Sequence, residues 1–110
     1  MKTLEQFRGE FEKPGKFYIL ESEEVSNQSK KGPVHINALN VQRTIESVQR
    51  KELSAQKVMR AALVKIKKQE RQSGVPILAH LNHPNFQWAI TAEDLAAVAE
   101  ENFFEVYNGH

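Results

Sequence analysis

The sequence has no cysteine, one tryptophan and almost no net charge. Without cysteine, disulfides and thiolate metal sites are excluded, so any metal site must use histidine, aspartate, glutamate or water. The 15 Lys and Arg residues nearly balance the 14 Asp and Glu residues, so overall charge favours neither nucleic acid nor membranes. The lack of cysteine suits both reducing and oxidising compartments and leaves localisation open.

Long apolar runs are also missing. None approaches the roughly 20 residues that a membrane span needs, and residues 1–6 are charged and amphipathic rather than typical of a signal peptide. The length of 110 residues suits one small domain. Because a turn pattern, Asn108-Gly109-His110, directly follows an apolar run, we interpret the chain as a fragment.

Strand and helix patterns alternate along the chain. Apolar spacing predicts helices over residues 2–11, 54–72 and 91–101. Strands are expected at residues 17–20, at 34–39 and at 103–107, and another starts at 76–79 and ends near His80 and His83. A polar loop is expected over 26–32. Residues 43–51 give no decisive pattern, and a short helix is one interpretation. This order predicts an α/β fold with a mainly parallel sheet and flanking helices.

Histidines and acids recur near the ends of the expected strands. The histidines are His35, His80, His83 and His110, and the acids are Glu23, Glu24 and Glu105. In parallel sheets such side chains gather at one edge. Histidine and carboxylate ligands without thiolates suit zinc, manganese or iron at a hydrolytic site.

Each of these residues also has a plainer interpretation. A single strand histidine such as His35 is more often a hydrogen-bonded core residue, and paired acids often close a strand in solvent. The three-residue offset of His80 and His83 would point them to opposite faces of one strand. Trp88 can line a pocket or pack on the helix beside it.

Lysines and arginines form a stripe along the long helix expected at residues 54–72. The residues are Lys57, Arg60, Lys67, Lys68 and Arg71. The stripe can contact a polyanion, but with balanced net charge a solvated outer face is the favoured interpretation.

Four segments carry a family resemblance. They are Ile-Leu-Glu-Ser-Glu-Glu-Val-Ser at 19–26, Val-His-Ile-Asn at 34–37, the stretch 77–86 with its His-Pro pair, and Phe-Glu-Val-Tyr-Asn-Gly-His at 104–110. In order and spacing they resemble the PHP (polymerase and histidinol phosphatase) family of metal-dependent phosphoesterases. Ser22 stands where that family usually has glycine.

The resemblance assigns roles to individual residues. Glu24 is similar to the metal-bridging carboxylate, and His35 and His83 are similar to metal-binding histidines. For His80, Glu105 and His110 it leaves several roles open: metal ligand, hydrogen-bond partner of a ligand, or phosphate contact. The family's His-x-His and Asp-x-His motifs are absent from this sequence. The resemblance therefore implies that residues 1–110 are part of a distorted (β/α) barrel of PHP type.

The expected function is hydrolysis of a small-molecule phosphate ester by water activated on divalent zinc, manganese or iron. With part of the ligand set missing, we expect the isolated chain to be inactive or weakly active. The alternative is a non-catalytic metal-binding or structural module, and contact with nucleic acid through the basic helix is less favoured. Half a barrel would expose strand edges, so a homodimer through those edges is also expected.

Overall fold

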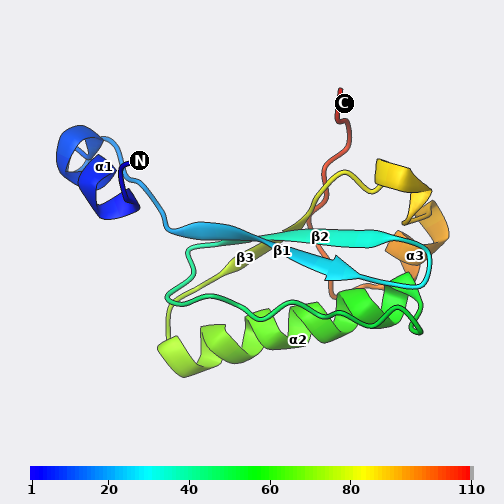
Figure 1. Ribbon diagram of the computed structural model, residues 1–110. Helices are drawn as coiled ribbons and strands as arrows, with labels where there is room; N and C mark the ends of the chain where they lie inside the picture. Colours follow the sequence, from blue (N-terminus) through cyan, green and yellow to red (C-terminus); the bar gives the residue numbers. More distant parts are fainter. Residues whose placement is uncertain (110) are drawn as a thin grey trace.

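The computed structural model describes residues 1–109, which form a three-stranded sheet with one long helix against it (Figure 1). In chain order the elements are α1 (Leu4–Phe11), β1 (Ser22–Gln28), β2 (Pro33–Leu39), α2 (Ala55–Ser73), β3 (Leu78–Leu81), the 3-10 helix η1 (Phe86–Trp88) and α3 (Ala92–Ala97). No helix in the described part is long and apolar enough to cross a membrane.

The strand order is β1-β2-β3, and both pairs are antiparallel. The predicted parallel sheet of a barrel is therefore wrong. One cause is the four-residue loop 29–32 between β1 and β2, because a short hairpin connection permits only antiparallel pairing. Gly32 fits this loop with φ of 149°, and a Cβ there would meet the Ala89 Cβ at 3.0 Å.

The first strand was predicted in the wrong place. The apolar residues 17–20 form no strand, and Phe17, Tyr18 and Leu20 are exposed. The polar segment Ser22–Gln28 pairs instead, with Val25 and Asn27 buried at alternate positions. Such alternation is typical of an antiparallel strand with one covered face.

Other predicted elements fare differently. The strand at 34–39 and the long helix are confirmed, and in the structure Ser54 and Gly74 cap α2. The helix that begins after Thr91 is real but ends at Ala97. Residues 43–51 contain no helix, and the strand expected at 103–107 is reduced to one parallel bridge between Leu81 and Phe104.

The core lies between α2 and the inner face of the sheet. From α2 it takes the buried residues Ala55, Val58, Met59, Ala62, Leu63 and Ile66. From the strands it takes Val25, Val34, Ile36, Ala38 and Leu81. Successive side chains of a strand point to opposite faces of the sheet. The polar side chains that alternate with these buried residues, such as Glu24, His35 and Asn37, therefore lie on the opposite, outer face.

Residues 41–49 run along the outer edge of β1 and bond to it largely through side chains. The Val48 N–H donates to the Asn27 Oδ1 at 2.8 Å, and the Ile45 N–H donates to the Glu23 carboxylate. One backbone bond, from the Gln28 N–H to the Val48 carbonyl at 2.9 Å, joins the same pair of segments. Glu23 is therefore used in holding this edge.

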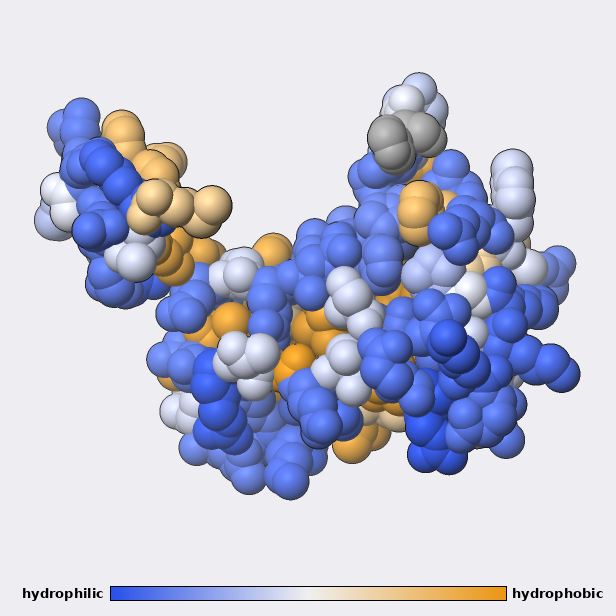
Figure 2. Space-filling view, viewed as in Figure 1, coloured by the Kyte–Doolittle hydropathy of each residue, from blue (hydrophilic) through white to orange (hydrophobic). Residues whose placement is uncertain are grey.

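Helix α1 stands apart from the sheet at the end of an extended connection (Figures 1 and 2). It buries no residue, and its Phe7 and Phe11 rings stack with centroids 6.1 Å apart. The Arg8 Nε donates to the Ile19 carbonyl at 3.2 Å and so ties α1 to this connection. The site residues thus belong to the body formed by the sheet, α2 and the segment after β3.

Candidate metal site

A row of polar side chains crosses the outer face of the sheet. In the register of the three strands, Glu24 lies opposite Asn37 and Asn37 lies opposite His80. His35 is two residues before Asn37 on β2 and so points to the same face. Glu24 and His35 are therefore diagonal cross-strand neighbours, close enough for their side chains to meet.

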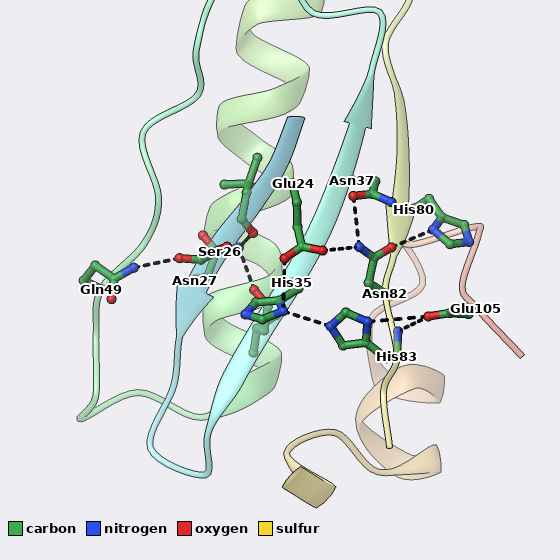
Figure 3. Close-up of polar contacts among 12 residues, drawn as sticks. Glu24, Ser26, Asn27, His35, Asn37, Gln49, His80, Asn82, His83 and Glu105 are labelled. Carbon is green, nitrogen blue, oxygen red and sulfur yellow. Dashed lines mark hydrogen bonds and ion pairs between the residues drawn. The ribbon is translucent and has the colours of Figure 1, made fainter. Parts of the chain in front are cut away.

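Glu24, His35 and His83 come together in one cluster (Figure 3). The His35 Nδ1 lies 2.9 Å from the His83 Nε2 and 3.3 Å from the Glu24 Oε1. One ligand atom from each residue lies within 4.8 Å of the other two. Both histidines are mostly buried and Glu24 is 40% exposed, so the cluster opens to solvent on its carboxylate side.

His83 reaches this cluster because the chain turns sharply after β3. Its φ of 24° is in the left-handed region, which a non-glycine residue rarely adopts. The turn carries His83 beyond the strand, so the alternation that would separate it from His80 no longer applies. The Phe86 ring packs against both histidines, with centroids 6.0 Å from His35 and 5.3 Å from His83.

Glu105 holds His83 from the other side. Its Oε2 accepts the backbone N–H of His83 at 2.6 Å and lies 3.6 Å from the ring Nδ1. The Glu105 N–H donates to the Leu81 carbonyl at 2.8 Å, which places the carboxylate beside β3. Hydrogen bonds from the His83 N–H and the Asn108 amide hold the pKa of Glu105 below its usual value. This carboxylate lies on the Nδ1 side of the His83 ring, and the Nε2 side faces His35.

The structure places the remaining predicted residues elsewhere. His80 is outside the cluster and bonds through Nδ1 to the Asn82 Oδ1 at 3.1 Å. Asn82 also contacts Glu24 and Asn37, and sequence analysis missed both asparagines. The position of Asn82 between two candidate histidines was the available signal. His110 lies outside the described residues.

The cluster is assembled differently from the prediction. We expected the ends of parallel strands to bring the ligands to one edge of a sheet. Glu24 and His35 instead lie within neighbouring antiparallel strands, and His83 arrives from the turn after β3. The meeting point is therefore the outer face of the sheet.

The donor set suits a divalent ion. One carboxylate oxygen and two imidazole nitrogens are ligands that zinc, manganese and iron accept. Ligands about 2.0–2.1 Å from a tetrahedral ion lie about 3.3 Å apart, and the separations of 2.9 and 3.3 Å at His35 are close to this. Three protein ligands leave a coordination position for water or substrate.

A pocket of about 520 Å³ adjoins the cluster. It is lined by Glu24, His35, His83, Asn85, Phe86, Gln87, Trp88 and Asn108, without lysine or arginine. Gln87 and Trp88 both have positive φ, of 52° and 54°. A non-glycine residue in this left-handed conformation lowers stability by about 1–3 kcal/mol, and such residues are frequent at ligand sites.

The basic stripe on α2 is partly neutralised. Arg60 pairs with Glu100 at 3.3 Å and also donates to the Ala97 carbonyl, and Lys67 pairs with Glu70 at 3.0 Å. These cations point away from the metal cluster because α2 covers the opposite face of the sheet. They supply no positive charge to the pocket.

Comparison with protein families, with characterised proteins and with solved structures finds no match to this chain. A functional interpretation therefore depends on the chemistry of the cluster and on the resemblance of its motifs. Fold similarity adds nothing to it.

Proposed function

We propose that Glu24, His35 and His83 bind a divalent metal ion at a phosphoesterase site. The observation that carries this proposal is the cluster itself, with three ligand atoms within 4.8 Å of one another at the mouth of a pocket. The chain gathers these side chains from β1, β2 and the turn after β3. The motif resemblance to PHP phosphoesterases adds the reaction type, hydrolysis of a phosphate ester.

Each residue has a defined part in this proposal. A zinc, manganese or iron ion at the site would supply an activated water nucleophile and offset charge on phosphoryl oxygens. Glu24 contributes the negative charge that holds the cation, and His35 and His83 contribute neutral nitrogen ligands. Because the pocket lining has no lysine or arginine, phosphate binding depends on the ion.

The isolated chain should be a weak catalyst. Three ligands can hold one ion, whereas two-metal catalysis needs ions about 3.5–4 Å apart and further ligands to fix them. The sheet does not form the barrel that the family resemblance implies. The proposal therefore rests on the site and its motifs, and a small-molecule phosphate ester is the substrate class they favour.

Metal binding is the first test. Trp88 is the only tryptophan and lines the pocket, so its fluorescence should fall when paramagnetic Mn²⁺ binds. Glu24→Gln should weaken binding strongly, since it removes the one anionic ligand. Glu23→Gln is the matched control, because this neighbouring carboxylate bonds to the Ile45 N–H instead. Absence of metal binding by the unaltered chain would overturn the proposal.

Hydrolysis is the second test. p-Nitrophenyl phosphate and its diester should be cleaved slowly with added manganese, zinc or iron, and not after chelation. His83→Ala should abolish this turnover. Equal turnover by the chain and by His83→Ala would come from a contaminant and would count against a catalytic site.

A non-catalytic metal-binding module is the alternative. It is favoured by the small ligand set of three residues among those described. Inorganic phosphate separates the two functions. A phosphoesterase site should bind phosphate only when loaded with metal, because the ion supplies the positive charge. Metal binding without any effect of phosphate would establish the alternative.

A further inference from the structure

The Asn82 side chain contacts three polar side chains on the outer face of the sheet, those of Glu24, Asn37 and His80 (Figure 3). Its Nδ2 donates to the Glu24 Oε2 at 2.7 Å and to the Asn37 Oδ1 at 2.9 Å. Its Oδ1 lies 3.1 Å from the His80 Nδ1. The residue is only 6% exposed, and its backbone N–H donates to the His35 carbonyl at 2.9 Å. Asn82 is therefore fixed at both its backbone and its side chain.

The partners determine which way the amide points. Glu24 and Asn37 both present oxygen acceptors, so the two hydrogens of the Asn82 Nδ2 face them. A flipped amide would set its oxygen against the Glu24 carboxylate, which has no hydrogen to donate, and would lose that bond. The Oδ1 must then face His80, where it can only accept a hydrogen. This requires a proton on the His80 Nδ1 and leaves a lone pair on Nε2 in the neutral ring.

The same amide also settles how Glu24 meets the cluster. The bond from Asn82 occupies Oε2, and Oε1 is the oxygen that lies 3.3 Å from His35. A carboxylate held in this way presents one oxygen to an ion and cannot rotate freely. Glu24 is otherwise 40% exposed, so without Asn82 little would fix its side chain.

We propose that Asn82 is a positioning residue of the metal site, holding the Glu24 Oε1 toward His35 and His83 and fixing His80 as the Nδ1–H tautomer. The part concerning Glu24 rests on the proposed metal function. The part concerning His80 does not, because the tautomer is a property of the metal-free chain. Asn82 itself does not touch the ion.

The tautomer of His80 is measured first, in the metal-free chain. Two-bond ¹H–¹⁵N correlations of the imidazole ring at a pH where it is neutral should show the proton of His80 on Nδ1. In Asn82→Ala the ring should shift toward the Nε2–H form that free histidine prefers. An Nε2–H ring in the unaltered chain would overturn the proposal, whether or not the chain binds metal.

Metal affinity is measured second, by the Mn²⁺ quenching of Trp88. Asn82→Ala should weaken binding roughly 10- to 100-fold, the usual effect of losing a group that orients a ligand. Asn82→Asp should weaken it as well, because a carboxylate cannot donate to Glu24. Unchanged affinity in both variants would overturn the role assigned toward Glu24.

Asn27→Ala is the matched control. Asn27 is also a buried asparagine of the sheet, 2% exposed, but its side chain bonds only to the backbone of Val25, Val34 and Val48. Its loss should lower stability and leave both the metal affinity of the folded chain and the His80 tautomer unchanged. An equal loss of metal affinity in Asn27→Ala and Asn82→Ala would show a general effect of destabilisation and would contradict a positioning role.

Discussion

The Glu105 Oε2 accepts the backbone N–H of His83 at 2.6 Å and lies 3.6 Å from the Nδ1 of the same residue. One carboxylate thus bonds to the main chain of a candidate ligand and lies at ion-pair distance from its ring. The backbone of His83 has a φ of 24°, so the turn needs such a partner to remain in place.

Glu105→Gln should therefore weaken metal binding. The amide keeps an oxygen for the His83 N–H but loses the charge that favours a proton on Nδ1 and a lone pair on Nε2. We expect roughly a 10-fold loss of affinity, within the range for such groups, measured by Mn²⁺ quenching of Trp88. Glu100→Gln, which alters a carboxylate paired with Arg60, is the control and should bind normally. Equal affinities would exclude an orienting role for Glu105.

Metal should stabilise the folded chain. Because the three ligands are far apart in sequence and meet only on folding, an ion binds the native state preferentially. At about 100 times its dissociation constant it should add about 2.7 kcal/mol to the free energy of unfolding. Urea denaturation with and without chelator measures this increment. His35→Ala should remove it, and an increment that survives this change would place the ion elsewhere.

Glu101→Gln should stabilise the chain at neutral pH. Burial raises the pKa of Glu101, and the hydrogen bond from the Phe103 N–H and the nearby His80 offset this only in part. A raised pKa means that the ionised form costs stability above that pKa, and the cost disappears as pH falls through it. The glutamine keeps an oxygen for the Phe103 N–H. We expect a gain of about 1 kcal/mol or less.

The check for Glu101 is urea denaturation at a series of pH values. The stability curves of the chain and of Glu101→Gln should converge toward acid. Curves that run parallel over the whole range would show that ionisation of Glu101 has no part in the difference.

Gln69→Ala should destabilise the fold by about 1–3 kcal/mol, the cost of leaving buried polar groups unpaired. The Gln69 amide accepts the Gln42 N–H and donates to the Arg43 carbonyl, both at 2.8 Å. Gln69 is a buried side chain, 3% exposed, that attaches the segment after β2 to α2. Thermal or chemical unfolding compares it with Gln72→Ala, which removes an exposed glutamine of the same helix whose Oε1 accepts a hydrogen bond from the exposed Arg43 side chain. Because water can replace that exposed bond, Gln72→Ala should cost much less stability. Equal effects of the two changes would contradict this assignment.

The sequence pattern within a single segment was enough to predict α2 and β2. Helix α2 has an apolar period, a serine cap and a glycine in the left-handed region at its end, Gly74 with φ of 69°. Strand β2 has the apolar alternation of a half-buried strand. Both signals lie within one segment, so no knowledge of its partners was needed.

The pairing of strands could not be obtained in this way. The apolar residues 17–20 have the composition of a strand, yet Tyr18 and Leu20 remain exposed because no neighbour covers them. The polar segment Ser22–Gln28 becomes a strand because the following loop returns the chain beside it. The antiparallel direction of β1 and β2 likewise depends on the short loop that folds β2 back beside β1, and amino-acid composition does not reveal that pairing.

The candidate site was partly visible in the sequence. Histidines and acids have a chemical signature, so Glu24, His35 and His83 could be named before their positions were known. A neutral amide such as Asn82 has no such signature, and its contacts depend on the register of three strands. Whether these residues bind metal stays a prediction.

The connection between α1 and the sheet has a practical consequence. Lys16 is exposed on it and is followed by Phe17, and α1 buries no residue against the body of the chain. A protease that cleaves after lysine should cut there first and release the helix. The remaining piece would keep Glu24, His35 and His83, and it would offer a smaller unit for crystallisation or isotope labelling.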